Sequence, residues 1–369
     1  MPLDQATFNF SASAYDTLGK TDDERYQTFI DVTEAGYRLG FETVWMAEHN
    51  FTDYYPIPSP LLAYAYVASR FPGLGLGTCV LVTPWYDPIR LASEISMLTV
   101  LTGAPLHLGV GRGTAPIEYE IYRADMRKSV TLFREGMEVI QLALKGEPFT
   151  YDGEEYKVSK PIQIRPHPHP ELVNFYGAVI DPKSTEKVAN LGFNMLGSSW
   201  FPFEVGQSNT ANFDNKVAEL GGSPRQKAVW VNTLIRDSDE EAVEAGRHHV
   251  SEFFKNSVAH YEHGGWDTSD YLQDDPNFAA TGKIFSGLKG FADINSEANE
   301  KFIQRQFIGS PQTVRERVQK YIDIGYDRII VQVDLHSVSR EDQIRSLTRF
   351  AEEVAPEFST TFQRRMAAV

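Results

Sequence analysis

Short apolar runs recur along the chain, each bounded by turn residues, and longer segments with a different periodicity stand between them. Runs of about four to eight apolar residues are typical of strands buried on both faces of a parallel sheet. The runs predict eight strands, at 8–13, 43–47, 74–82, 106–110, 173–179, 193–197, 228–235 and 328–333.

The longer segments repeat apolar residues at a spacing of about 3.6, which predicts helices. The first helix opens at Thr21, which has capping-box spacing with Glu24, and ends at Gly40. The other helices are expected at 58–68, 88–101, 130–144, 184–191, 213–220, 239–263, 311–324 and 343–354. This regular alternation favours a (β/α)₈ TIM barrel with insertions over a doubly wound open sheet.

Two segments interrupt the alternation. Residues 145–170 combine polar turn residues with a proline–histidine run, which predicts a hairpin followed by turns. Residues 264–296 are irregular and rich in glycine, and they form either a lid over a binding site or a surface insertion without a role. Residues 1–369 are otherwise expected to form a single barrel domain.

Composition and charge narrow the class of protein. Apolar residues make up 42% of the chain and aromatic residues 12%, enough for a large core. With 35 basic and 50 acidic residues the net charge is −15, so nucleic acid is not an expected partner. One cysteine excludes an intrachain disulfide and a cysteine-based zinc site. Neither a signal peptide nor a membrane segment is recognisable, and a cytoplasmic protein is expected.

The apolar run 43–47 ends abruptly in Glu48, His49 and Asn50. The carboxyl ends of parallel strands are where α/β enzymes build their active sites. Histidine is the side chain best suited to taking and giving a proton near neutral pH. His49 is therefore a candidate catalytic residue, and a hydrogen-bonded core histidine is the alternative.

Two other strand ends have features of anion sites. Arg112 stands between glycines just after the strand 106–110, although Thr114 departs from the dinucleotide fingerprint. A tight turn with an exposed arginine is the alternative. Asp181, Ser184 and Thr185 stand at the start of a predicted helix, where amides and hydroxyls suit an anion, and ordinary N-capping is the alternative.

Histidines and aromatic residues supply the remaining candidates. His248, His249, His260 and His263 fall on one predicted helix and are expected to be solvated, so no metal site is predicted. Aromatic residues gather in the predicted loops at the strand ends and are suited to line an apolar or planar ligand: Tyr54, Tyr55, Trp85, Tyr86, Tyr119, Tyr122, Trp200 and Phe201.

Four segments, in this order and on matching elements, resemble the bacterial luciferase-like family of flavin-dependent monooxygenases. They are WMAEHNF at 45–51, DPIRLASE at 87–94, LGVGRG at 108–113 and GSPQTV at 309–314. The resemblance implies a (β/α)₈ barrel that binds reduced FMN, supplied by a separate flavin reductase, at its C-terminal mouth. It also implies O₂ as co-substrate, a peroxyflavin that oxygenates a small apolar or carbonyl substrate, and a homodimer.

The resemblance also assigns residues. His49 matches the family's catalytic histidine. Arg112, Ser184 and Thr185 would hold the FMN phosphate, and Asp181 is a further cofactor-binding residue. Cys79–Val80 matches a non-proline cis peptide beneath the flavin ring. The residues expected to contact substrate are Glu48, Asn50, Trp85, Tyr86, Tyr122 and Trp200.

Three departures from the family pattern argue against light emission. Asn50 replaces the second histidine of the usual pair, Asp87 replaces the histidine before Pro88, and Gly111 stands where the luminescent enzymes have a reactive cysteine. Two other functions remain open: a deazaflavin-dependent hydride-transfer oxidoreductase, and a non-catalytic flavin-binding partner subunit.

Overall fold

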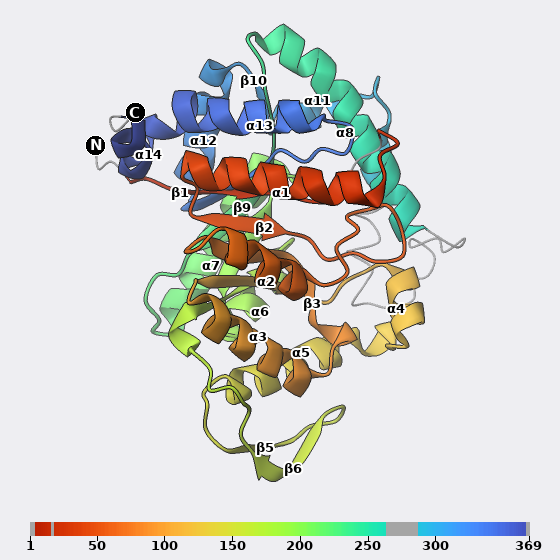
Figure 1. Cartoon of the computed structure of the whole chain (residues 1–369), viewed down its shortest axis with the longest axis vertical. Helices are drawn as coiled ribbons and strands as arrows, with labels where there is room; N and C mark the ends of the chain where they lie inside the picture. The colour runs from red at the N-terminus through yellow and green to blue at the C-terminus, as the bar shows by residue number, and fades with distance from the viewer. Residues whose placement is uncertain (1–3, 16–17, 263–286, 367–369) are drawn as a thin grey trace. The chain divides into compact units, whose positions relative to one another are not determined.

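The computed structural model describes residues 4–15, 18–262 and 287–366 (Figure 1). Eight parallel strands of one sheet close into a barrel with helices between them, so the predicted (β/α)₈ fold is confirmed. Each strand lies within two residues of its expected bounds. The strands are β1 (Thr7–Ser11), β2 (Thr43–Met46), β3 (Gly75–Val82), β4 (Leu106–Gly111), β7 (Val173–Ala178), β8 (Asn194–Ser198), β9 (Lys227–Ile235) and β11 (Arg328–Gln332).

All the predicted helices are present, although several have different bounds. The helices of the described residues are α1 (Asp22–Leu39), α2 (Pro60–Arg70), α3 (Pro88–Thr102), α4 (Pro116–Tyr122), α5 (Ser129–Ala143), α6 (Pro182–Asn190), α7 (Phe203–Glu219), α8 (Asp239–Tyr261), α11 (Glu297–Ile303), α12 (Pro311–Asp323), α13 (Arg340–Arg349) and α14 (Thr360–Met366). None of these helices combines the length and apolar character that crossing a bilayer demands.

The pattern shortened α7 and missed four short elements, α4, β10 (Phe307–Gly309), α11 and α14. Helix α7 begins at Phe203 rather than at 213, because its first turns bury small and polar residues such as Gly206 and Asn209. Helix α4 was expected to be a loop, and β10, which pairs with β9, was not predicted. Both are too short to show a clear period.

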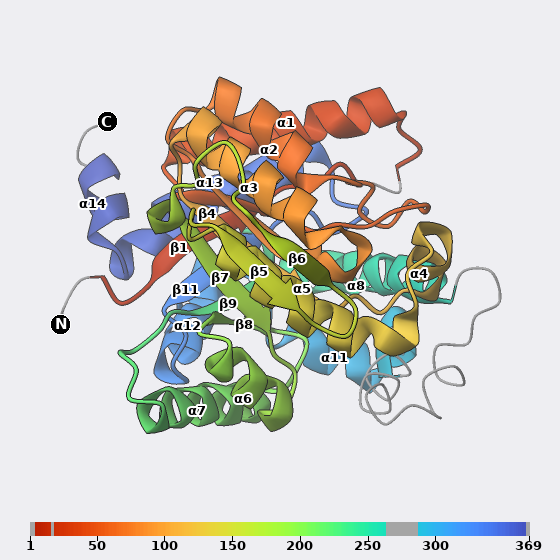
Figure 2. The ribbon, with the colours of Figure 1, turned by 90° about the horizontal axis from the view of Figure 1, so that it is seen from below.

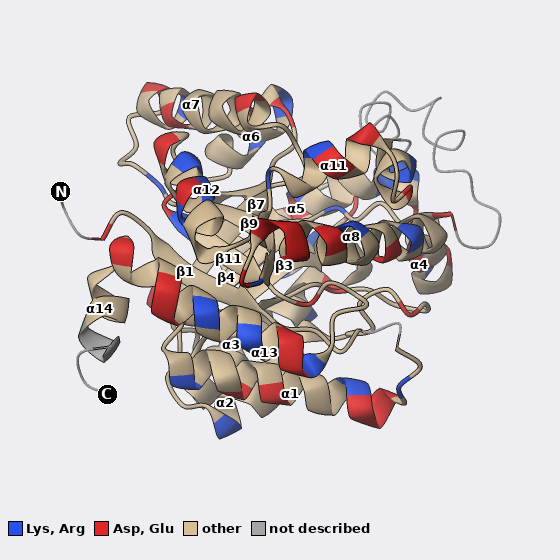
Figure 3. Ribbon diagram, turned by 90° about the horizontal axis from the view of Figure 1, so that it is seen from above, with Lys and Arg blue, Asp and Glu red and all other residues tan. Residues whose placement is uncertain are grey.

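The chain divides into two compact units, of which the first comprises Met1–Met46, Phe175–Asn256 and Leu288–Val369. In it β1 pairs with β2 and β11, and β9 pairs with β8 and β11. Helices α6 and α7 pack side by side (Figure 2). Charged side chains gather on the helices and loops, whereas the strands are mostly uncharged (Figure 3).

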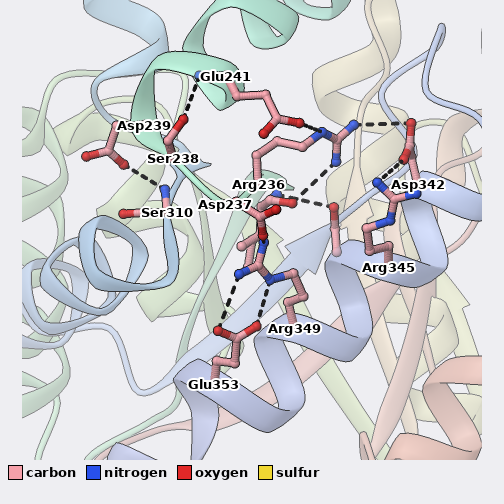
Figure 4. A network of polar contacts seen from close by, with 12 residues as sticks. Arg236, Asp237, Ser238, Asp239, Glu241, Ser310, Asp342, Arg345, Arg349 and Glu353 are labelled. Carbon is pink, nitrogen blue, oxygen red and sulfur yellow. Dashed lines mark hydrogen bonds and ion pairs between the residues drawn. The ribbon is translucent and has the colours of Figure 1, made fainter.

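A polar network joins β9, α8, α12 and α13 in this unit (Figure 4). The buried Arg236 lies 3.1 Å from Asp342, and Arg349 lies 2.7 Å from Asp237. Asp239 accepts the Ser310 backbone N–H at 2.6 Å. Because the partners are 71 to 112 positions apart in sequence, the network fixes the loops that follow β9 and β10.

The second unit comprises Ala47–Asn174 and Ser257–Gly287. Strands β3 and β4 pair in it, with a register shift between Thr78 and Leu81. The expected non-proline cis peptide, Cys79–Val80, lies within this shift. The predicted hairpin is also present, as β5 (Phe149–Asp152) and β6 (Lys157–Ile162).

The irregular segment 264–296 is described only in part. Residues 264–286 of the predicted lid lie outside the described residues. Residues 287–292 are helical. There Phe291 packs on Phe254 of α8 with ring centroids 4.9 Å apart, and Ser251 donates to the Ala292 carbonyl at 2.6 Å. This end of the segment is anchored to α8.

Candidate active site

The predicted site residues fall into two groups, one in each unit. The second unit holds Glu48, His49, Asn50, Cys79, Val80, Trp85, Tyr86, Arg112 and Tyr122. The first unit holds Asp181, Ser184, Thr185 and Trp200.

In the second unit, a buried carboxylate lies between two histidines. His49 Nδ1 lies 3.3 Å from Glu118 Oε1, which also accepts the Asn50 backbone N–H at 2.7 Å. His260 Nε2 lies 3.6 Å from Glu118 Oε2, and His260 Nδ1 lies 2.6 Å from Thr52 Oγ1. Glu118 is supplied by α4, His260 by α8, and the other three residues by the loop after β2.

The two histidines determine the charge of Glu118. Burial alone would raise the pKa of this carboxyl, but the charges and hydrogen bonds of His49 and His260 outweigh burial and lower it to about 2. Glu118 is therefore an ionised carboxylate at neutral pH, although its side chain is only 1% exposed. A buried charge of this kind is stable only with partners, and the imidazoles supply them.

The same three side chains also form a set that occurs in metal centres. One ligand atom from each of His49, Glu118 and His260 lies within 4.8 Å of the others. Glu118 Oε1 is satisfied by His49 and by the Asn50 backbone N–H, whereas Oε2 lies 3.6 Å from His260 Nε2, which is beyond hydrogen-bond length. The cluster can serve as an acid–base group, because an imidazole and a carboxylate can exchange a proton.

Glu48, the residue before His49, is in the opposite state. Its buried carboxyl accepts the Val82 backbone N–H at 2.8 Å and a hydrogen bond from the Tyr86 hydroxyl. Burial raises the pKa of Glu48 to about 8, despite these two hydrogen bonds. At neutral pH this group is therefore mainly a neutral carboxylic acid.

An aromatic cavity lies beside this loop. It has a volume of about 410 Å³, and Trp85, Tyr86 and Tyr122 line it together with four charged residues, Arg123, Asp125, Lys128 and Glu155. Trp85 and Tyr122 are stacked with ring centroids 5.6 Å apart. The Tyr122 hydroxyl donates to Asn50 Oδ1 at 2.8 Å. Both neighbours of His49 are thus hydrogen-bonded to a tyrosine of the cavity wall.

The glycine–arginine segment after β4 is shaped by packing. A Cβ at Gly111 would lie 2.8 Å from Val80, and one at Gly113 would lie 2.6 Å from Val82. Gly113 also has a φ of +69°, which favours glycine. Arg112 is half-buried between them, and its carbonyl accepts the Tyr119 hydroxyl. The glycines are therefore required by close packing whatever Arg112 binds.

In the first unit, the N-capping interpretation of the 181–185 segment is confirmed. Asp181 Oδ1 accepts the Ser184 backbone N–H at 2.7 Å, and the Ser184 hydroxyl completes a capping box. The buried Thr185 hydroxyl donates to the Asp181 carbonyl at 2.9 Å. Trp200 packs on Phe253 and Phe254 of the same unit. A role in phosphate or substrate binding stays a prediction for these residues.

Sequence reasoning missed Glu118, Thr52 and His260. The prediction that His260 is solvated is wrong, since only 1% of the residue is exposed. It shares a helix face with the buried Phe253 and Ser257, and this spacing in the sequence could have predicted that His260 is buried. Glu118 follows Pro116, a helix-start signal that also identifies α4.

Comparisons with known proteins agree with this fold. The chain is 25% identical to the oxygenase component of the flavin-dependent trigonelline monooxygenase of Acinetobacter baylyi, over 95% of each chain. It resembles the FMN-bound oxygenating constituent of the Pseudomonas putida 3,6-diketocamphane monooxygenase, a type II Baeyer–Villiger enzyme, with a TM-score of 0.70, 17% identity and coverage of 96% and 99%. An F420-dependent secondary alcohol dehydrogenase gives a TM-score of 0.73 at 14% identity, with coverage of 95% and 98%.

The sequence profile described as luciferase-like monooxygenase matches residues 6–328. Because this match spans most of the chain and every strand of the barrel begins within it, the protein belongs to the luciferase-like monooxygenase family.

Proposed function

We propose that this protein is the oxygenase component of a flavin-dependent monooxygenase that uses reduced FMN and O₂ to oxygenate a small apolar or carbonyl substrate. The observation that carries the proposal is the placement of His49. Its neighbours Glu48 and Asn50 are hydrogen-bonded to Tyr86 and Tyr122 in the wall of the aromatic cavity. A histidine held against Glu118 thus stands beside a ligand-sized space.

The side chains present fit a flavin and its substrate. The cavity volume of about 410 Å³ is within the range of small-molecule sites, and aromatic faces suit planar rings. In the second unit, Arg112 would bind the phosphate with two donors. In the first unit, the N-terminus of α6, with Ser184 and Thr185, offers amides and hydroxyls that suit the same group. Reduced FMN with O₂ supplies the oxygenating chemistry.

The side chains of this protein would contribute acid–base catalysis. His49 would take or give a proton at Nε2, the nitrogen on the side of the ring away from Glu118. The neutral Glu48 adds no charge beside the cavity. Trp85 and Tyr122 would present their ring faces to a ligand in the space that they line.

A separate flavin reductase is the proposed protein partner. The trigonelline relative is named as an oxygenase component, which supports division of the reaction between two proteins. The glycine–arginine segment after β4 lacks the dinucleotide fingerprint, which supports an external source of reduced flavin. A cytoplasmic location completes the proposal and is supported by the single cysteine.

We also propose a homodimer, with α2 and α3 at its interface. These neighbouring helices of the second unit expose Leu62, Tyr66, Met97, Val100 and Leu101. Leu62 with Tyr66, and Met97 with Leu101, are four residues apart and so share helix faces. A contiguous apolar surface on two packed helices is typical of a protein–protein interface.

A deazaflavin-dependent hydride transfer is the second candidate function. It is supported by the likeness to the F420-dependent alcohol dehydrogenase, which shares the fold. Oxygen consumption separates the two candidates, since hydride transfer needs no O₂. The third interpretation, a non-catalytic partner subunit, is disfavoured by His49 and its buried carboxylate partner.

The test is an anaerobic titration of the purified chain with reduced FMN, followed by addition of O₂. Saturable binding and oxygen consumption that depends on an added substrate would support the monooxygenase. His49→Ala is expected to lower turnover by about 10²–10⁴-fold while flavin affinity is kept. Failure of reduced FMN to bind would reject the oxygenase, and the deazaflavin would be titrated next.

A further inference from the structure

Four polar side chains follow one another through the second unit: Thr52, His260, Glu118 and His49. Thr52 is hydrogen-bonded to His260 and Glu118 to His49, and His260 Nε2 lies 3.6 Å from Glu118 Oε2 between them. We propose that Glu118 is a positioning residue that fixes His49 in the tautomer with its proton on Nδ1, leaving Nε2 as the proton acceptor. The role of Nε2 as a proton acceptor during turnover rests on the proposed function. The tautomer of His49 can be measured without flavin or substrate.

The direction of the chain follows from the carboxylate at its centre. An ionised carboxylate only accepts hydrogen bonds, so each nitrogen that faces it must carry a proton. His49 faces Glu118 with Nδ1, and His260 faces it with Nε2. His49 is therefore protonated at Nδ1 and His260 at Nε2. The Thr52 hydroxyl then donates to His260 Nδ1, at 2.6 Å.

Glu118 is held in place by a backbone contact and by its position on α4. Its Oε1 accepts the backbone N–H of Asn50, a donor that cannot reverse, at 2.7 Å. Its position on α4 follows from Pro116 at the first turn of that helix. The carboxylate is thus anchored from the loop that carries His49 and from a separate helix. This double anchoring sets the orientation of the imidazole as well as its tautomer.

The same logic operates wherever a buried carboxylate orients a catalytic histidine. An amide in place of the carboxylate keeps the shape but presents one donor and one acceptor, and such a change is known to favour the wrong tautomer. In this chain the Asn50 N–H requires an oxygen at the Oε1 position. The NH₂ group of Glu118→Gln must then face His260, so this substitution distinguishes the two imidazoles.

The experiment is ¹⁵N NMR of the histidine rings in the flavin-free protein, recorded over a pH series that reaches neutral imidazoles, where the spectrum reports which ring nitrogen is protonated. In the wild-type chain we expect His49 as the Nδ1–H form and His260 as the Nε2–H form. In Glu118→Gln, His260 should change to the Nδ1–H form while His49 is unchanged. In Glu118→Ala, His49 should lose its preference for one tautomer.

Glu120→Gln is the matched control, because Glu120 is an exposed residue of the same helix and its replacement removes the same charge. It should leave both rings unchanged. A wild-type His49 protonated at Nε2, or a His260 ring that ignores Glu118→Gln, would overturn the proposal. The wild-type spectrum decides even where a variant does not fold.

Turnover supplies a separate readout. Glu118→Ala should lower kcat by about 10²-fold or more, with little change in the affinity for reduced FMN, whereas Glu120→Gln should alter neither. A chain that does not turn over at all would reject the proposed function and leave the ring spectra to decide the role of Glu118.

Discussion

Glu48 and Glu118 are both buried carboxyls close to His49, yet their surroundings give them opposite charges at neutral pH. Glu118 faces two imidazoles and is ionised, whereas Glu48 faces an amide and a phenol, and burial raises its pKa to about 8. The difference illustrates that the partner, and not the depth of burial, decides the protonation state.

The raised pKa of Glu48 makes stability depend on pH. Between about pH 4.5 and pH 8 the folded chain keeps a proton that the unfolded chain has released, so stability falls as pH rises through this window. Glu48→Gln should remove this decline and gain on the order of a few kcal/mol over wild type at pH 9. Denaturant unfolding at pH 5, 7 and 9 checks this, with the exposed Glu42→Gln as control. Equal slopes for wild type and Glu48→Gln would contradict it.

Arg112 carries a prediction about ligand choice. If its guanidinium holds the FMN phosphate, Arg112→Ala should weaken binding of FMN by about tenfold or more and leave riboflavin, which lacks the phosphate, nearly unaffected. Titration of both flavins into wild type and variant measures the difference. Equal losses for the two ligands would remove Arg112 from the phosphate site.

The strand-end chemistry was largely readable from the sequence, whereas the contacts across the chain were not. Glu48, His49 and Asn50 stand together in sequence, so their common site could be predicted. Glu118 lies 69 positions after His49, and a local pattern carries no information about which distant side chain a histidine will face. The buried position of His260 became evident only with the fold.

At the scale of elements, the sequence pattern predicted the helices and strands that are long enough to show a hydrophobic period. The eight barrel strands were found because each contains apolar residues that are buried; β9, for example, is buried along its whole length. The predicted range of α7 was too short because the buried positions of its first turns are glycine, asparagine and threonine. Short elements such as α4 and β10 contain too few residues to establish a period.

The turn after β4 gives a prediction with an internal control. Gly113 and Gly103 both have positive φ, but only at Gly113 would a Cβ also meet a neighbour, at 2.6 Å. Gly103→Ala should therefore cost about 1 kcal/mol of unfolding free energy, from backbone strain alone. Gly113→Ala should cost about 1–3 kcal/mol more, because Val82 must shift. Chemical denaturation of both variants gives the comparison, and equal costs would contradict the packing argument.

At the scale of the whole molecule, the apolar face of α2 and α3 predicts self-association. Leu62 is 73% exposed and Leu101 is 66% exposed, which is unusual for leucines on adjacent helices. The double substitution Leu62→Asp and Leu101→Asp should convert a dimer to a monomer without unfolding it. Sedimentation velocity measures the mass of each species.

Leu220→Asp is the control for that experiment, since Leu220 is 49% exposed but belongs to neither α2 nor α3, at the end of α7 in the first unit. It should leave the dimer intact. A wild-type chain that sediments as a monomer at micromolar concentration would refute the interface.

The hydrogen bonds that join Glu48 to Tyr86 and Asn50 to Tyr122 have a consequence for engineering the cavity. Tyr86 and Tyr122 line the cavity and also hold the loop that carries His49. A library that randomises them would therefore change substrate selectivity and the position of His49 at the same time. Leu132 also lines the cavity, and it is apolar, so it makes no such bond. Directed evolution toward new substrates should therefore begin at Leu132 and keep the two tyrosines constant.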